Sequence, residues 1–266
     1  MRRIFSFSIA ILSIAAISGC SSPRKMVDVV VVQNETDVRS APAAASTSAA
    51  PSQAPAAPKP APAAEPAKQT AQIPDSFSLN IAFAQQAPFG NWDAVHEETC
   101  EEASMIMVDK YLKRQPLSEQ IMEQELQKLL AWENEHGYKV DLTAQETVDV
   151  LGSYFNVSAH LSRNVTADQI KYELSQNKPV IIPAAGRTLG NPNFKYPGPI
   201  YHMLVIKGYN GSQFITNDPG TRKGNSYVYP FDRLINAIHD WNPELAAAMT
   251  EADMLKGEKV MVIVDK

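Results

Sequence analysis

The sequence predicts an α+β domain that follows a long segment with almost no core-forming residues. Helix patterns come first in the C-terminal region and strand patterns mostly come later, which is typical of an α+β fold rather than of alternating βαβ units. The 266 residues carry 24 basic and 29 acidic side chains, for a formal net charge of −5. Because there is no positive excess, we do not expect a nucleic-acid partner.

Residues 1–19 have the pattern of an export signal. A basic head is followed by an apolar stretch, Ile4–Ile17, and then by Ile17-Ser18-Gly19-Cys20. This order is typical of a signal peptide, and the apolar run is too short for a stable membrane span. The tetrapeptide resembles a bacterial lipobox, whose cysteine is acylated and becomes the mature first residue. We therefore expect an exported protein that is attached to a membrane by lipid at Cys20. The alternative is an ordinary secretory signal with a cysteine near the cut by chance.

Residues 20–40 are expected to form the anchor and the start of a tether, and residues 41–76 an Ala/Pro-rich disordered linker. From Ala41 to Gln72 the sequence has 14 Ala and 7 Pro and lacks aromatic residues, Leu, Ile, Val and Met. Such a segment buries too little apolar surface to offset the entropy of ordering it. The run Val27–Val32 interrupts this composition, and its role is not predicted.

The folded domain is expected over residues 77–266, and its elements follow from capping signals and hydrophobic periodicity. Two pairs have the spacing of a capping box, Thr143 with Glu146 and Thr166 with Gln169. Ser118 can cap the start of another helix, and Gly137 follows its end. The predicted helices are 100–112, 118–135, 143–154, 166–176 and 231–241. The predicted strands are the apolar runs 157–161, 180–184, 203–209, 213–217 and 259–264.

Cys100 is the first candidate for chemistry. If Cys20 carries lipid, Cys100 is the only free thiol of an exported protein. It begins a predicted helix, and the partial positive charge of a helix N-terminus stabilises a thiolate. A cysteine nucleophile also needs a base, usually a histidine, which an acid or amide orients. A lone cysteine in a helix is otherwise most often a small core residue.

His202 is the best-placed of the five histidines, and Asp218 is its expected partner. His202 opens an apolar strand, Asn210-Gly211 is a hairpin turn signal, and Asp218 follows the returning strand. A strict two-residue turn would pair Met203 with Asp218 and put the two side chains on opposite faces. A three-residue loop or a β-bulge would bring them onto one face. The sequence leaves these alternatives open.

Three ordered segments resemble the peptidase C-39-like domain, a relative of the bacteriocin leader peptidases. These segments are Gln86–Trp92 with Cys100–Ser104, then Tyr201–Tyr209, and then Asn217–Gly220. The resemblance implies a papain-like fold, with a nucleophile helix packed on an antiparallel sheet. It also implies Cys100 as nucleophile, His202 as base and later acid, Asp218 as the orienting residue, and Gln86 as an oxyanion donor. The implied partner is a peptide or protein substrate.

The sequence departs from the family pattern at two places. Glu101 follows the cysteine where the family commonly has Gly, and Gln86 lies further from the cysteine than in the leader peptidases. Glu97, Glu98, Glu101 and Glu102 also crowd the thiol. Their charge raises the pKa of a thiol, whereas the helix dipole and a cationic His202 lower it. The sequence does not show which effect is larger.

Other features have plainer interpretations. Trp92 and Tyr201 are expected to pack rather than to bind ligand, and His239-Asp240 is expected to be structural because adjacent helix residues point apart. The loop 186–199 is either a lid beside the site or an ordinary surface loop. We expect no metal site and no cofactor. Two other functions remain open: a catalytically silent peptide- or cell-wall-binding module, and an amidase or endopeptidase acting on peptidoglycan stem peptides.

Overall fold

The computed structural model describes residues 73–265. The predicted export signal, the lipid site at Cys20, the run Val27–Val32 and the tether up to residue 72 lie outside the described residues. The strands form one antiparallel sheet in the order β2-β7-β3-β4-β5-β6, with β1 paired to β4. Their bounds are β1 Ser76–Ser78, β2 Ala159–Ser162, β3 Val180–Ala185, β4 Tyr201–Asn210, β5 Gln213–Asn217, β6 Tyr227–Pro230 and β7 Met261–Val264.

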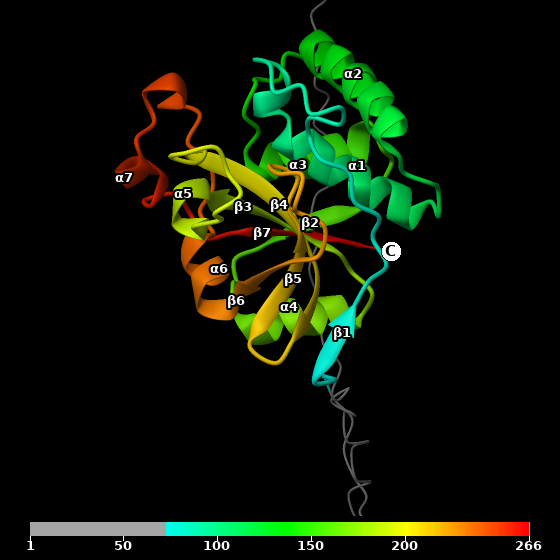
Figure 1. The fold of residues 1–266 in the computed structure, drawn as a ribbon, viewed down its shortest axis with the longest axis vertical. Helices are drawn as coiled ribbons and strands as arrows, with labels where there is room; N and C mark the ends of the chain where they lie inside the picture. Colours follow the sequence, from blue (N-terminus) through cyan, green and yellow to red (C-terminus); the bar gives the residue numbers. More distant parts are fainter. Residues whose placement is uncertain (1–72, 266) are drawn as a thin grey trace, which may run out of the picture. The chain divides into compact units, whose positions relative to one another are not determined.

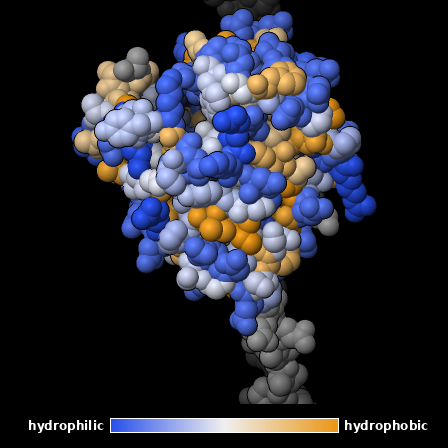
Figure 2. Space-filling view, viewed as in Figure 1, coloured by the Kyte–Doolittle hydropathy of each residue, from blue (hydrophilic) through white to orange (hydrophobic). Residues whose placement is uncertain are grey.

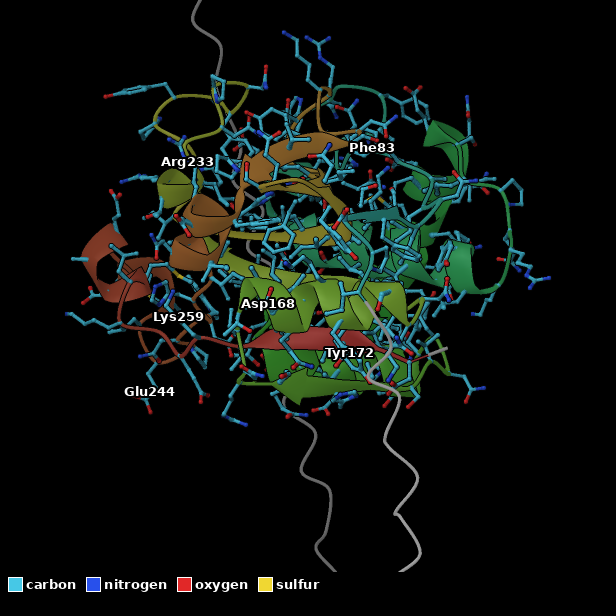
Figure 3. The ribbon with its side chains drawn as sticks, turned by 90° about the horizontal axis from the view of Figure 1, so that it is seen from below. Phe83, Asp168, Tyr172, Arg233, Glu244 and Lys259 are labelled. Carbon is cyan, nitrogen blue, oxygen red and sulfur yellow. The ribbon has the colours of Figure 1, made fainter. Side chains whose placement is uncertain are left out.

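Helices cover the sheet on two sides. In Figure 1, α1, α2 and α3 lie above the sheet and α4 lies below it. Figure 3, seen from below, shows α4 in front of the strands, marked by Asp168 and Tyr172. The helix bounds are α1 Cys100–Leu112, α2 Glu119–His136, α3 Ala144–Ser153, α4 Ala167–Ser175, α5 Gly186–Leu189, α6 Phe231–Ala237 and α7 Glu251–Met254, with 3₁₀ turns η1 His96–Glu98 and η2 Ala246–Ala248.

The capping signals set the ends of the helices. The Ser118 side chain accepts a hydrogen bond from the Ile121 N–H, and Gly137 ends α2 with a φ of 79°. That left-handed conformation favours glycine because it has no Cβ. At α3, Thr143 and Glu146 form a reciprocal capping box. The predicted starts of α1 to α4 are confirmed to within one residue, and side-chain caps mark those of α2, α3 and α4.

The predicted helix 231–241 is wrong at its end, and several short elements escape prediction. Helix α6 ends at Ala237 because Ile238 takes an extended conformation and bridges to Ala184 of β3. The unpredicted elements, β1, β6, α5, α7 and the two 3₁₀ turns, are too short for a periodic pattern to reveal them. Ser76, the last residue of the predicted linker, already belongs to β1, where it pairs with Asn210 of β4.

Strand β4 is the centre of the sheet and is buried along almost its whole length. Its first half pairs with β3, and its second half pairs with both β1 and β5. A Cβ on Gly208 would stand 2.5 Å from the Phe77 carbonyl oxygen, so the approach of β1 requires a glycine there. The pairing of β1 with β4 leads the following segment along the sheet toward the candidate residues. The Leu79 N–H donates to the Lys207 carbonyl, and the Gln86 N–H donates to the Pro219 carbonyl.

Polar side chains dominate the face shown in Figure 2, and apolar residues form only small patches between them. Within the described residues, no helix combines the length and apolar character that crossing a membrane requires.

Candidate active site

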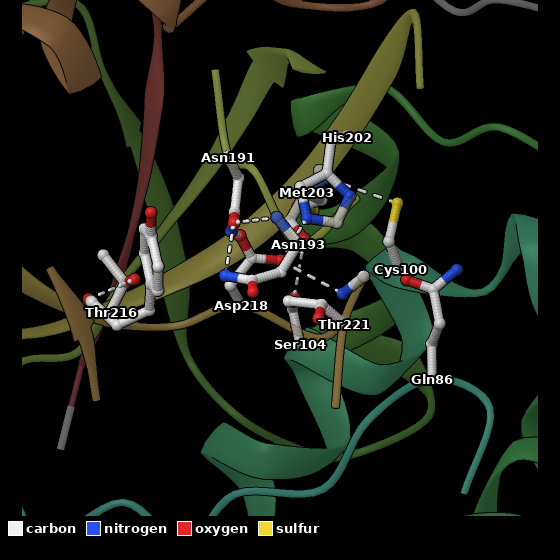
Figure 4. Close-up of polar contacts among 12 residues, drawn as sticks. Gln86, Cys100, Ser104, Asn191, Asn193, His202, Met203, Thr216, Asp218 and Thr221 are labelled. Atoms are coloured by element: carbon white, nitrogen blue, oxygen red, sulfur yellow. Dashed lines mark hydrogen bonds and ion pairs between the residues drawn. The ribbon is translucent and has the colours of Figure 1, made fainter. Parts of the chain in front are cut away.

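Cys100, His202 and Gln86 line one cleft of about 860 Å³. Cys100 begins α1, His202 lies near the start of β4, and Asp218 directly follows β5. The thiol lies beside His202, because the backbone N–H of Met203 donates a 3.2 Å hydrogen bond to Cys100 Sγ. Figure 4 shows the sulfur of Cys100 next to the imidazole of His202. Chain segments more than a hundred residues apart thus meet at one place.

His202 and Asp218 form a buried pair. His202 Nε2 lies 2.8 Å from Asp218 Oδ1, and the side chains are 2% and 0% exposed. Since Nε2 faces the carboxylate, Nδ1 is the ring nitrogen left for the cleft. The ring of Phe194 lies edge-on to the imidazole at 5.2 Å between centroids and limits its rotation.

The Asp218 carboxylate is held ionised by hydrogen bonds. The Gly220 N–H donates to Oδ1, and Tyr229 Oη and Asn191 Nδ2 donate to Oδ2 at 2.6 Å and 3.0 Å. Burial by itself would raise the pKa of Asp218. The charge of His202 and the hydrogen bonds from His202, Tyr229 and Asn191 outweigh burial and lower that pKa below its usual value.

Gln86 lines the cleft, but its amide N–H₂ group points away from the thiol, whereas an oxyanion donor would point toward it. Its Nε2 donates to the carbonyl oxygens of His96 and Glu97, at 2.8 Å and 3.0 Å. Its Oε1 has no hydrogen-bond partner among the described residues, and Figure 4 shows this oxygen on the side of Cys100. The amide must turn by half a rotation about its last bond before an N–H can face an oxyanion.

The four glutamates around the thiol have different surroundings. Glu101 is fully buried against Cys100, whereas Glu102 is buried against Glu133 of α2. Glu97 pairs with Lys195 at the surface, and Glu98 lines the cleft. Burial is the largest effect that raises the pKa of Cys100, followed by the charge of Glu101 when that carboxyl is ionised. These effects outweigh the Met203 N–H, which lowers the pKa, so the pKa of the thiol lies above its ordinary value.

Several site residues were not singled out from the sequence. Asn191 belongs to the Pro- and Gly-rich loop 186–199, and Tyr229 to the unpredicted strand β6, so only their contacts reveal them. Residues 193–199 of that loop line the cleft. Trp92 and Tyr201, predicted to pack, also line it, and the Tyr201 hydroxyl donates to the Leu142 carbonyl at 2.7 Å.

The remaining polar pairs serve the framework. His239 Nδ1 contacts the Gly257 carbonyl oxygen, and Asp240 accepts hydrogen bonds from the Ala144 and Trp241 N–H groups, so both side chains bind the backbone. They lie beyond the end of α6, whereas the prediction placed them on a helix. Within residues 73–265, no three His, Cys, Asp or Glu side chains are arranged to hold a metal ion.

Several solved structures are similar to this chain, among them the following two. One is a C39-like peptidase candidate from Bacillus anthracis, with 15% sequence identity and a TM-score of 0.47, covering 73% of this chain and 98% of that one. The other is a double glycine motif protease from an AMS/PCAT transporter in complex with its leader peptide, with 16% identity and a TM-score of 0.37, covering 71% and 95%. No curated protein matches the chain.

A family model supplies the assignment. The model of the Peptidase_C39 like family matches residues 78–244, which include all four candidate residues, Gln86, Cys100, His202 and Asp218. The helices packed on an antiparallel sheet are the predicted α+β, papain-like fold. The chain therefore belongs to the Peptidase_C39 like family.

Proposed function

We propose that this chain is a cysteine peptidase that cleaves peptide or other amide bonds through a thioester at Cys100. The observation that carries the proposal is the buried His202–Asp218 pair, 2.8 Å apart, with the Cys100 sulfur on the neighbouring Met203 N–H. A nucleophile, a base and a group that orients the base are the minimum for covalent acyl transfer.

The steps follow from the positions of the atoms. His202 Nδ1 takes the thiol proton as Cys100 Sγ bonds to the carbonyl carbon of the substrate. The same nitrogen gives that proton to the leaving amine, and the C–N bond breaks to leave the thioester. Water then adds to the thioester with His202 as base, which releases the acid and restores the thiol. Asp218 keeps the imidazole in the required tautomer and stabilises its cationic form.

The oxyanion needs two donors. The Cys100 N–H faces no acceptor among the described residues, as is usual for the first residue of a helix. The Gln86 amide becomes the second donor once it turns. Each such donor contributes about 3 kcal/mol to the stability of a transition state. Gln86→Ala should therefore lower kcat much more than it changes KM.

The proposal is tested with a thiol-alkylating activity probe on the folded, reduced domain. We expect labelling at Cys100, none in Cys100→Ala, and slower labelling in His202→Ala and Asp218→Asn. Labelling that is absent, or unchanged by His202→Ala, would instead indicate a peptide- or cell-wall-binding module. Products from peptide libraries and from peptidoglycan fragments then separate a general peptidase from a stem-peptide amidase.

The proposal includes export and attachment to a membrane by lipid at Cys20. It is supported by the lipobox-like tetrapeptide and by the core-poor segment that follows it. The test is the distribution of the full chain between membrane and soluble fractions. Cys20→Ala should move the protein out of the membrane fraction and leave the folded domain intact. An unchanged distribution would contradict lipid attachment at this residue.

A further inference from the structure

The carboxyl group of Glu101 is buried between the candidate nucleophile and the start of α3. Its Oε2 lies 3.0 Å from Cys100 Sγ, and its Oε1 accepts a 3.1 Å hydrogen bond from the Leu142 N–H. The side chain is 0% exposed. One oxygen is thus used by the backbone, and the other has the sulfur as its hydrogen-bonding neighbour.

Two groups form hydrogen bonds with the sulfur, and only one of them is always a donor. The Met203 N–H always donates to Sγ, whereas the role of Glu101 depends on its proton. An ionised carboxylate accepts a hydrogen bond from the thiol and repels a thiolate. A protonated carboxyl donates its O–H to Sγ, since Oε1 is already paired with the Leu142 N–H.

The titratable groups that face Glu101 are one thiol, two carboxyls and one phenol, and none of them is a cation. Cys100 and Glu102 lie on the same helix, Asp141 precedes Leu142 in the chain, and Tyr201 comes from β4. Burial and then the charge of Asp141 raise the pKa of Glu101 to about 8, against the lowering effect of its hydrogen bonds. At neutral pH the side chain therefore keeps its proton.

We infer that Glu101 is a positioning residue that controls the reactivity of Cys100 through its own proton. Protonated, it donates to Sγ and stabilises the thiolate that forms when the thiol proton moves to His202. Ionised, it holds Cys100 as a neutral thiol. The Glu101 proton stays on its carboxyl throughout. The only proton that moves is the thiol proton, which passes from Cys100 Sγ to His202 Nδ1. The effect on turnover rests on the proposed peptidase function, whereas the effect on the thiol does not.

The test is the rate of Cys100 alkylation by iodoacetamide, measured from about pH 6 to about pH 10. An ordinary thiol reacts faster as pH rises, because more of it is thiolate. For the wild-type domain we expect a rate that rises with pH up to about pH 8, where Glu101 ionises, and then levels off, because the carboxyl loses its proton before the thiol does. In Glu101→Gln, whose amide does not ionise and donates to Sγ at every pH, the plateau should disappear and the rate should keep rising.

Glu102→Gln is the matched control, because this neighbouring carboxyl is buried against Glu133 rather than against the thiol; the plateau should remain in it. Glu101→Asp, which draws the carboxyl back from Sγ, is a second variant should Glu101→Gln fold poorly, and it should also lose the plateau. A wild-type rate that rises steadily with pH, or the same plateau in Glu101→Gln, would overturn the inference.

The two proposals fail separately. A plateau in alkylation above about pH 8 without any peptide cleavage would remove the peptidase function and keep the role of Glu101. Peptide cleavage by a thiol whose alkylation rises steadily with pH would do the reverse.

Discussion

His202 and Asp218 share one face of the sheet because a β-bulge at Lys207 shifts the register between β4 and β5. The pairs next to the turn are Asn210 with Gln213 and Gly208 with Ile215, and beyond Lys207 the pair is Val205 with Asn217. Without the bulge, Val205 would face Asp218. His202, an odd number of residues from Val205, would then lie on the opposite face.

The bulge is held by the segment that follows β1. The Lys207 carbonyl accepts a 2.7 Å hydrogen bond from the Leu79 N–H, and its ammonium group donates to the Ile81 carbonyl at 3.4 Å. The turn itself has two residues, Gly211 and Ser212, one position later than the turn signal suggests. Of the ways to bring the pair together that the sequence leaves open, the chain uses the bulge.

Tyr229→Phe tests how the Asp218 carboxylate is stabilised. The lost hydroxyl donates to Asp218 Oδ2 at 2.6 Å, and a hydrogen bond to a charged group is worth about 1.5–3 kcal/mol. We expect a higher pKa for Asp218, slower alkylation of Cys100 and a loss of stability of that size. The control is Tyr227→Phe, whose hydroxyl does not contact Asp218. Equal rates in both variants would show that Asp218 does not need Tyr229.

Gly220→Ala tests the space around the imidazole. An added Cβ would stand 2.8 Å from His202 Cε1 and 3.2 Å from its Nε2, which is closer than atoms tolerate. The ring must move away from Asp218, so the reactivity of Cys100 should drop while the fold persists. Gly152→Ala, whose Cβ would meet nothing within 4 Å, is the control. A reactive thiol in Gly220→Ala would mean that the position of the ring is not critical.

The Glu102–Glu133 contact predicts a pH dependence of stability. Burial raises the pKa of Glu133 from its ordinary 4.5 to about 7, and burial with the charges of Glu101 and Glu133 raises that of Glu102. The folded state therefore binds protons more tightly than the unfolded chain. The contribution of this pair to the free energy of unfolding is largest below about pH 4.5 and falls as pH rises through about 7.

Glu133→Gln should flatten this part of the profile and exceed wild-type stability above about pH 7. Denaturant unfolding at a series of pH values measures the difference. Glu135→Gln, an exposed change on the same helix, should follow the wild type. Parallel profiles for wild type and Glu133→Gln would contradict the prediction.

Thr143→Ala tests the capping box of α3. The change removes the side-chain acceptor for the Glu146 N–H and should cost about 1 kcal/mol of stability. At α4, Thr166 accepts from the Gln169 N–H, but the Gln169 side chain bonds to Asn164 and Glu173 instead of returning a bond to Thr166. Thr166→Ala should therefore cost less. Equal losses in denaturant unfolding would mean that the reciprocal bond adds nothing.

The sequence by itself determined the features that depend on neighbouring residues. The starts of α2 to α4 follow from the caps Ser118, Thr143 and Thr166, the start of α1 follows from hydrophobic periodicity, and β5 follows from one short apolar run. Cys100 and His202 could be chosen because each begins a strongly patterned element. The family resemblance then gave them roles, and the family model supports the assignment of the domain.

Tertiary structure decided what depends on distant segments. Whether His202 faces Asp218 depends on one extra residue in β4, and that residue is held by the segment after β1, a strand too short to have a pattern. The contacts of Glu101, Gln86, Asn191 and Tyr229 depend on which distant backbone groups lie beside them. Side-chain periodicity carries no information on such contacts, because register and burial are set by the packed sheet rather than by the local chain.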